Sequence, residues 1–158
     1  MKFKELTDRK TGELLYGDLT GQVRKNNGII DVDYDTTGIK MTSLEGAPKK
    51  CYRIYAMNNE LVDLKHSPEE CTSMSVDSNP TLVSLEGAPK EISTYFSCKD
   101  NPNLKNPMEQ IYKYRIRAKT YETDEGYYNF IDIEDMFENY FKYKAIKSKG
   151  FKTLLGLK

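Results

Sequence analysis

The heptapeptide Ser-Leu-Glu-Gly-Ala-Pro-Lys occurs twice in this chain, at residues 43–49 and 84–90. A degenerate copy at residues 64–68 lies almost midway between them, and a further trace follows at residues 104–107. The copies therefore recur about every 20 residues. So short a period is typical of a solenoid, in which each repeat forms one strand and one return segment and packs on near-identical neighbours. Solenoids usually bind partners and seldom catalyse reactions.

Three repeats align on an asparagine that holds the same place in each, at Asn59, Asn79 and Asn101. Apolar residues stand five and three residues before each asparagine, and a leucine follows it: Ile54, Met74 and Phe96, then Ala56, Val76 and Cys98, and finally Leu61, Leu82 and Leu104. Apolar residues that alternate with polar ones indicate a strand with one buried face. Each repeat is therefore predicted to form one half-buried strand that ends at its asparagine.

The asparagines and glycines of the repeats have predicted structural roles. The side-chain amide of each asparagine can bond to backbone groups of its own turn and of the neighbouring coil. Gly46 and Gly87 permit a tight bend before a proline, and His66 holds the same place in the middle repeat. We expect His66, the only histidine, to be a turn residue, because no nucleophile or ligand motif accompanies it.

The combined pattern Asn-x-x-Leu-x-x-Leu-x-Gly-Ala-Pro resembles the leucine-rich-repeat class. More narrowly, it looks like the short Leu-x-Gly-Ala-Pro-Lys repeat proteins that tailed bacteriophages encode. The resemblance covers about residues 39–107, and the middle repeat departs from it at His66 and Ser67. It implies a phage accessory protein in the host cell cytoplasm. Small phage proteins of this sort dock on host proteins, defence factors among them, and modulate or inhibit them.

The repeats and their flanks predict a single α+β domain over residues 1–158. Its centre, residues 41–106, is expected to be a short leucine-rich-repeat-like solenoid of about 3–4 coils. A solenoid exposes its core at both ends and needs caps. We therefore expect a β-hairpin N-terminal cap in residues 1–40 and a two-helix C-terminal cap in residues 107–158.

The N-terminal cap is predicted from a turn signal and an alternating segment. Asn27-Gly28 is a strong two-residue signal for a hairpin. Ile30, Val32 and Tyr34 alternate with aspartates, which indicates a strand that can stack on the first coil.

The two helices of the C-terminal cap are predicted from their start signals. Asn106 is a candidate N-cap, with Glu109 as its capping partner, for a helix over residues 107–121. A strand stays an alternative for this segment, since it has apolar residues at every second position: Tyr112, Tyr114, Ile116 and Ala118. A second helix is expected over residues 133–147, with Asp132 as its cap.

Composition narrows the classes of function. The chain has 24 basic and 24 acidic residues, so net charge gives no general attraction to nucleic acid or membranes. We expect no signal peptide and no membrane span, because no apolar run reaches about 18 residues. Cys51, Cys71 and Cys98 lack the C-x-x-C spacing of metal sites, so we expect reduced, buried side chains. Cys51 and Cys71 should stack on adjacent coils, where a disulfide bond between them is geometrically possible.

No pattern specifies a catalytic residue, a cofactor or a metal site. The chain has no phosphate-binding loop, nucleophile elbow or His-Glu-x-x-His motif. Asp31, Asp33 and Asp35 are spaced like the start of a calcium loop, but Thr36 and Thr42 stand where that loop needs glycine and glutamate. A solvated acidic face is favoured. An enzyme with paired carboxylates between the cap helices and the coils stays an alternative, because such pairs have no fixed spacing.

The strand residues that alternate with the buried ones should form an exposed face, which commonly receives partners in leucine-rich repeats. They are Arg53, Tyr55 and Met57, then Ser73, Ser75 and Asp77, and finally Tyr95, Ser97 and Lys99. The small serines should leave a shallow groove between Tyr55 and Tyr95. Arginine and tyrosine are enriched in binding hot spots. We therefore predict that a partner contacts Arg53, Tyr55, Met57, Asp77, Tyr95 and Lys99.

The sequence thus favours a non-enzymatic protein-binding module, whose partner is expected to be a host protein. The alternative is a nucleic-acid-binding protein, because residues 142–158 contain six lysines and no acid, with aromatic residues between them. A homodimer is also compatible, since a short solenoid leaves apolar edges at its ends. No membrane partner is expected.

Overall fold

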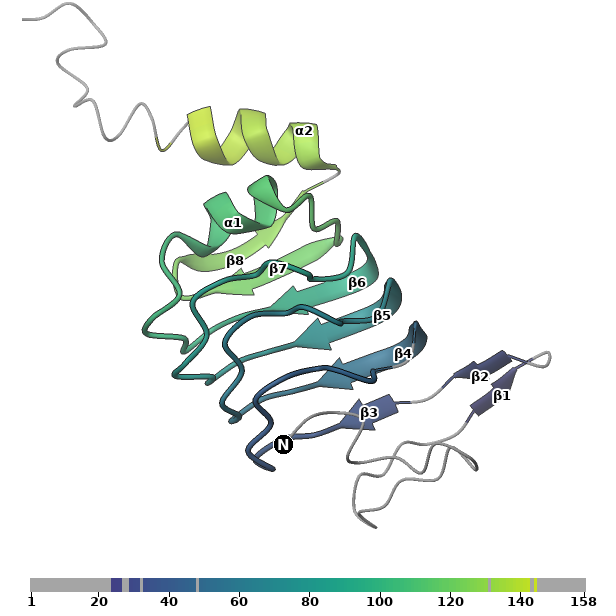
Figure 1. Ribbon diagram of the computed structural model, residues 1–158. Helices are drawn as coiled ribbons and strands as arrows, with labels where there is room; N and C mark the ends of the chain where they lie inside the picture. The colour runs from purple at the N-terminus through teal and green to yellow at the C-terminus, as the bar shows by residue number, and fades with distance from the viewer. Residues whose placement is uncertain are drawn as a thin grey trace, which may run out of the picture.

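The computed structural model describes residues 24–26, 29–31, 33–47, 49–130, 132–142 and 144. Its main element is a six-stranded sheet with the order β3-β4-β5-β6-β7-β8 (Figure 1). The strands are β3 (Asp33–Asp35), β4 (Lys50–Tyr55), β5 (Glu70–Ser75), β6 (Glu91–Ser97), β7 (Thr120–Thr123) and β8 (Gly126–Asn129). All pairs are parallel except β7 with β8. The chain is a β-solenoid of about 4 turns.

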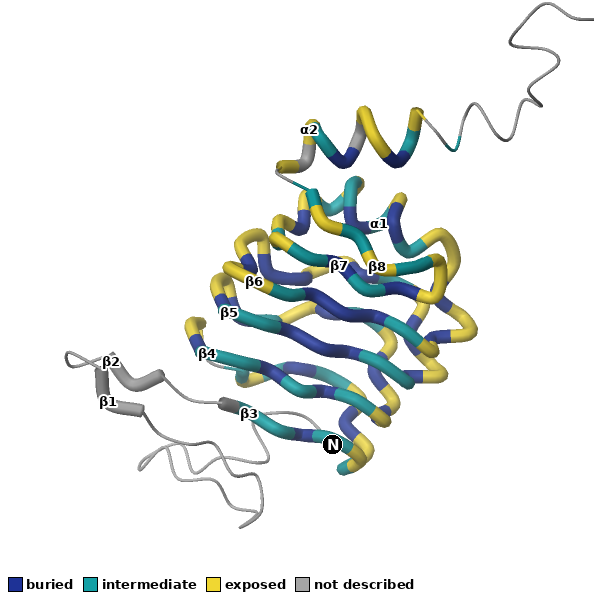
Figure 2. The backbone as a smooth tube through the Cα atoms, turned by 180° about the vertical axis from the view of Figure 1, so that it is seen from behind, coloured by how far each residue is buried: buried dark blue, intermediate teal, exposed yellow. Residues whose placement is uncertain are grey.

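The core lies between the sheet and the return segments (Figure 2). The predicted inward strand residues are confirmed, since each is at most 1% exposed: Ile54, Ala56, Met74, Val76, Phe96 and Cys98. The parallel register stacks Ile54 on Met74, and Met74 on Phe96. Burying one large aliphatic or aromatic side chain stabilises a fold by about 1.5–3 kcal/mol. Stacking of like side chains therefore supplies the main driving force that holds the coils together.

The predicted hydrogen-bonding role of the asparagines is confirmed. The prediction that each strand ends at its asparagine is wrong, because β4, β5 and β6 end four residues earlier, at Tyr55, Ser75 and Ser97. Each asparagine is at most 2% exposed: Asn59, Asn79 and Asn101. The Asn79 Nδ2 donates to the Ala56 carbonyl of the preceding coil and to the Val76 carbonyl of its own coil, both at 2.9 Å. Its Oδ1 accepts from the Leu61 backbone N–H at 3.2 Å. One side chain thus satisfies buried backbone groups of two successive coils, where water cannot reach them.

The repeated turn before the proline requires a left-handed backbone. Gly46 and Gly87 have φ values of 96° and 89°, which glycine adopts without a steric penalty. His66 takes the same conformation at φ 68°, as its place in the repeat predicts. Its side chain is exposed. Histidine in this slot is therefore a turn residue whose Cβ makes the conformation more costly than glycine would.

Replacing His66 with glycine should stabilise the fold slightly. The substitution removes the Cβ penalty of the left-handed region, about 1–2 kcal/mol. The greater freedom of glycine in the unfolded chain offsets about 0.5–1 kcal/mol of this gain. We expect the free energy of unfolding of His66→Gly, measured by urea denaturation, to rise by up to about 1 kcal/mol. A loss of stability would show that the imidazole makes a contact that holds this turn.

The hairpin expected near the N-terminus is confirmed. The strands β1 (Arg24–Asn26) and β2 (Ile29–Asp31) are antiparallel, with Asn26 opposite Ile29. The next strand, β3, pairs in parallel with β4 and places Tyr34 opposite Ile54, so the alternating segment does stack on the first coil. The side chains of Ile30 and Val32 lie outside the described residues.

The helix predicted over residues 107–121 is wrong in its second half. The observed helix α1 (Pro107–Lys113) ends at Tyr114, and Arg115 then takes a left-handed φ of 57°. The predicted start is confirmed, since Asn106 is the N-cap residue and Pro107 begins the helix, but Asn106 has a left-handed φ of 50° and its side chain makes no capping hydrogen bond. The Asn106 carbonyl instead accepts from the Gln110 backbone N–H at 3.1 Å.

The segment after α1 adds a rung to the sheet. Ile116 is fully buried, and the Arg117 backbone N–H donates to the Lys90 carbonyl of the preceding coil at 3.0 Å. In β7 the buried Tyr121 lies opposite Phe96. The alternative strand interpretation therefore holds only for the part of the segment after Tyr114, where Arg117 forms a parallel bridge with Glu91 and Ile116 is buried, while Tyr112 lies in α1. Burial of Ile116 and Tyr121 against the existing sheet outweighs the weak intrinsic helix preference of this part.

The last described element is helical. It comprises α2 (Ile133–Met136) and the π-helical turn η2 (Phe137–Phe141). The Asp132 Oδ1 accepts from the Asp135 backbone N–H at 2.8 Å, so the predicted cap of this helix is confirmed. Met136 and Tyr140 are buried. The predicted end of this helix, near residue 147, lies outside the described residues.

The three cysteines are free and buried, as the sequence predicts. Cys51 and Cys71 face each other across the β4–β5 pair, which confirms that they stack on adjacent coils. Burial raises the pKa of the Cys98 thiol above its ordinary value, so this side chain behaves as a small apolar residue rather than a nucleophile.

Candidate functional site

The outward side chains of the sheet form a continuous surface, which we call the strand face. The register places them in rows: Arg53, Ser73, Tyr95, Thr120 and Asn129 in one row, and Tyr55, Ser75, Ser97, Glu122 and Tyr127 in the next. Met57, Asp77 and Lys99 follow the strand ends at a third level, where backbone bonds from Asn58 to Asp77 and from Ser78 to Lys99 join successive coils. All six predicted partner-binding residues belong to this face.

At one end of the strand face, Arg53 is held by two tyrosines of its own strand. Its guanidinium carbon lies 4.8 Å from the centre of the Tyr52 ring. Its Nη1 donates to the Tyr55 hydroxyl across a long 3.5 Å. All three side chains are half-buried. A cation over an aromatic ring is stabilised by about 0.5–1 kcal/mol at an exposed site, so these contacts restrict the guanidinium without neutralising its charge.

At the other end, the polar side chains bond to one another. The Asp77 Oδ1 accepts from the Ser97 hydroxyl at 2.6 Å and from the Lys99 backbone N–H at 2.8 Å. The Lys99 Nζ lies 2.8 Å from the Glu122 Oε1, and the Tyr95 hydroxyl donates to the Glu122 Oε2. Lys99 is therefore neutralised inside the molecule, and the Tyr95 ring is fixed in position by its hydroxyl.

The ionisation states of this network follow from its contacts. Burial and the hydrogen bond to Glu122 raise the pKa of Tyr95 to about 12. The bonds from Lys99 and Tyr95 hold the pKa of Glu122 below its ordinary value. At neutral pH the tyrosine is therefore protonated and the glutamate charged, which is the pairing that the hydrogen bonds need.

The serines of the strand face lie deeper than predicted. Ser75 and Ser97 are only 4% and 0% exposed, so they form the floor of the face rather than contact points. The Ser97 hydroxyl also donates to the Asp77 Oδ1 of the preceding coil. Ser73 stands between Arg53 and Tyr95 in its row. The short side chains at these positions leave the flanking aromatic and cationic groups as the prominent features of the face.

Three residues of the strand face escaped the prediction from sequence. Tyr52 faces outward because the inward pattern shifts after Cys51, as the burial along β4 shows. The buried Cys51, three residues before Ile54, is the signal that could have revealed this shift. Glu122 and Tyr127, the latter 62% exposed, lie on strands beyond the recognised repeats, where the sequence offers no comparable signal.

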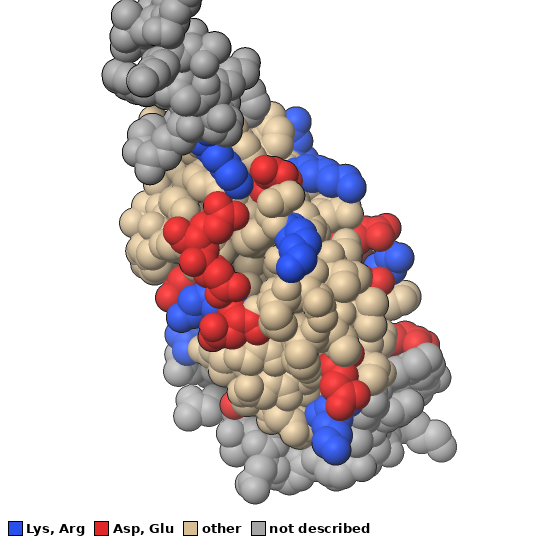
Figure 3. All heavy atoms as spheres, turned by 90° about the vertical axis from the view of Figure 1, so that its left-hand side faces the viewer, with Lys and Arg blue, Asp and Glu red and all other residues tan. Residues whose placement is uncertain are grey.

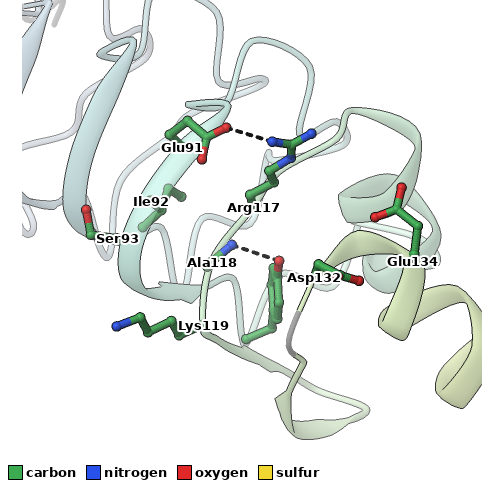
Figure 4. Close-up of a pocket in the computed structure, with 9 residues that line it drawn as sticks. Glu91, Ile92, Ser93, Arg117, Ala118, Lys119, Asp132 and Glu134 are labelled. Carbon is green, nitrogen blue, oxygen red and sulfur yellow. Dashed lines mark hydrogen bonds and ion pairs between the residues drawn. The ribbon is translucent and has the colours of Figure 1, made fainter.

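A polar cavity of about 370 Å³ lies where β6 starts and α2 begins (Figure 4). Charged side chains line it: Glu91, Arg117, Lys119, Asp132 and Glu134. Arg117 Nη1 lies 3.2 Å from the Glu91 Oε1, and Asp132 holds the first turn of α2. Figure 4 shows Lys119 extending away from Arg117 and Glu134. Two of the three carboxylates thus have structural partners, and the charged groups do not converge on one point.

Acidic side chains gather over the edge at which the parallel strands end (Figure 3). Asp35 ends β3, and its carboxylate accepts from the Thr37 backbone N–H at 3.0 Å. Asp77 and Asp124 accept backbone N–H groups of the neighbouring coil, from Lys99 and Asp100 respectively. Among the described residues, no cluster of three or more histidine, cysteine or acidic side chains could hold a metal ion. The side chains of Asp31 and Asp33 lie outside the described residues.

The lysine-rich segment predicted as a nucleic-acid surface lies mostly outside the described residues. Of its lysines, Lys142 pairs with Glu138 at 3.2 Å, and Lys144 lies 3.5 Å from both Glu109 and Glu125. These two cations are therefore neutralised by carboxylates. Within the described part of the chain, every helix is too short or too polar to cross a membrane.

Comparison with known proteins gives no independent guide to the site. No protein-family model matches the chain, and no curated protein or solved structure matches it either.

Proposed function

We propose that the chain is a non-enzymatic binding module of the leucine-rich-repeat type, and that its strand face docks on a protein of a bacterial host. The hairpin β1–β2 and the helical segment α2–η2 would act as the caps that a short solenoid needs. The resemblance to phage repeat proteins supports a host target, such as a defence factor, that the docked protein modulates or inhibits.

The observation that carries this proposal is the spacing of hot-spot residue types on the strand face. Tyr55 and Tyr95 come from coils on either side of β5, and short serine side chains separate them. Tyrosine and arginine supply much of the binding energy in protein interfaces. Side chains held on stacked strands also lose little freedom when a partner binds, which reduces the entropic cost of association.

Removing both tyrosine rings should abolish capture of the partner. We expect Tyr55→Ala combined with Tyr95→Ala to fold normally but to bind a protein from host lysate about 30-fold less tightly or worse, because a hot-spot truncation costs at least about 2 kcal/mol. The measurement is affinity capture from bacterial lysate with quantitative mass spectrometry, followed by titration of the protein captured.

The matched control removes exposed apolar groups from the return segments. Val62 and Val83 are 49% and 51% exposed, and Val83 donates its backbone N–H to the Val62 carbonyl at 3.1 Å. Val62→Ala with Val83→Ala should retain capture. If the folded tyrosine double variant captured the same protein as strongly as the original chain, the strand face could not be the docking surface.

A further inference from the structure

Arg53 differs from Lys99, the other cation of the strand face, in having no negative partner among the side chains that the structure describes. Lys99 is neutralised by Glu122 at 2.8 Å. Arg53 instead contacts only Tyr52 and Tyr55, and it makes no ion pair with any residue that the structure describes. A guanidinium has five N–H donors in a planar fork, of which the bonds to the Tyr55 and Tyr52 hydroxyls use two. Most of its hydrogen-bonding capacity therefore remains for a partner.

The surroundings of Arg53 leave room beside it. In its row the next residue is Ser73, whose hydroxyl already bonds to Thr94 at 2.8 Å. Tyr95 follows on the next strand, about 10 Å from Arg53 between backbones, since neighbouring strands lie about 4.8 Å apart. The Tyr95 hydroxyl is occupied by Glu122. One side chain of a partner can therefore enter over Ser73, between the guanidinium and the tyrosine ring.

We propose that Arg53 binds the carboxylate of an aspartate or glutamate side chain from the protein partner, and that this contact sets the register of the partner on the strand face. This inference rests on the proposed docking function and names the chemistry of its central contact. The planar fork of arginine matches a carboxylate with two parallel hydrogen bonds. Tyr52 and Tyr55 hold the fork in place before the partner arrives.

The charges around Arg53 select an isolated carboxylate rather than a polyanion. Asp33 lies opposite Arg53 in its row, and its side chain lies outside the described residues. Of the described carboxylates of the strand face, Asp35, Asp77 and Glu122, only Glu122 is paired with a cation. A nucleic-acid backbone has a phosphate at every nucleotide, so it would bring further negative charge toward these groups. A protein segment can place one acidic residue at Arg53 and neutral or basic residues elsewhere.

Selection of random displayed peptides on the 158-residue chain tests this inference even while the natural partner is unidentified. The original chain should enrich peptides that share one acidic position. The charge-reversed variant Arg53→Glu should enrich lysine or arginine at that position instead. Arg115 provides a matched control, because its guanidinium carbon lies 4.7 Å from the Tyr112 ring centre on a segment outside the sheet. Arg115→Glu should give the same acidic enrichment as the original chain.

The enriched peptides then allow a direct measure of the contact. Changing the shared Asp or Glu to its amide should weaken binding to the original chain by about 10- to 100-fold, the effect expected of a hydrogen-bonded charged pair. On Arg53→Ala the same change should have almost no effect. A peptide with a free or an amidated C-terminus should bind equally, which separates a side-chain carboxylate from a terminal one. Thermal unfolding of each variant checks that it is folded.

The outcomes separate this inference from the proposed function. Peptides that depend on Tyr55 and Tyr95 but show no acidic preference, or no sensitivity to Arg53→Ala, would overturn the carboxylate contact and leave docking on the strand face standing. Enrichment that is insensitive to every strand-face substitution, or no enrichment at all, would overturn both. Tighter binding of a labelled single-stranded oligonucleotide than of any enriched peptide, lost in Arg53→Ala, would assign Arg53 to a phosphate instead.

Discussion

Replacing Asn79 with alanine is expected to reduce the free energy of unfolding by about 4 kcal/mol. The side chain is fully buried, and its loss leaves the Leu61 backbone N–H and the Ala56 carbonyl without their partners. A buried polar group left without a hydrogen bond costs about 1–3 kcal/mol, and the small cavity adds to this. A domain of this size is stable by only about 5–15 kcal/mol. Urea denaturation of Asn79→Ala measures the loss.

An exposed asparagine provides the control for this substitution. Asn103 also bonds to a carbonyl of the preceding coil, with its Nδ2 2.6 Å from the Pro80 oxygen, but it does so at the surface. Water can replace this bond, so Asn103→Ala should cost less than about 1 kcal/mol. Equal losses for the two variants would mean that burial of the amide, and hence the ladder of asparagines, is not what holds the coils together.

The second large effect is expected at Gly87, where two coils touch through their backbones. A Cβ added to Gly87 would lie 2.4 Å from the Lys65 Cα and 2.8 Å from the Leu64 carbonyl carbon. Backbone atoms cannot move aside as the end of a flexible side chain can. The left-handed φ of 89° adds about 1–2 kcal/mol for any residue with a Cβ, and forced overpacking costs about 1–3 kcal/mol. We expect Gly87→Ala to lose about 3–5 kcal/mol by urea denaturation.

Gly38 separates the two causes of this loss. It has a similar left-handed φ of 74°, but nothing lies within 4 Å of the place that its Cβ would take. Gly38→Ala should therefore show the conformational cost alone, about 1–2 kcal/mol. If Gly87→Ala were no worse than Gly38→Ala, the close approach of successive coils at Gly87 would not exist in solution.

The repeat pattern predicts the inner half of the fold because one asparagine fixes the phase of each rung. Once Asn59, Asn79 and Asn101 are aligned, the apolar residues five and three places earlier must face the core, and they do. The glycine slot likewise predicts the left-handed turn, including His66. These features depend on the spacing of residues within one repeat, and this spacing can be read from a single sequence.

Features that depend on contacts between distant segments could not be predicted in the same way. The rung β7 lacks the asparagine that follows β4, β5 and β6, and Asp124 follows it in a turn to the antiparallel β8. The alternating residues just before β7 therefore fitted a helix about as well as a strand. The bond between Ser97 and Asp77 joins residues 20 positions apart. The register of the strands decides which outward groups neutralise one another. Only this register reveals that Arg53 has no ion-pair partner among the described residues.

A nuclear magnetic resonance titration tests most directly whether stacked rungs present one recognition surface. An enriched peptide is added to the isotope-labelled chain, and the shift of each backbone amide is followed. The account predicts that the amides of Arg53, Ser73 and Tyr95, which come from three coils and share one row, shift together at a common dissociation constant. The amides of Val62 and Val83 should stay unchanged. Shifts confined to the return segments, with none along this row, would contradict it.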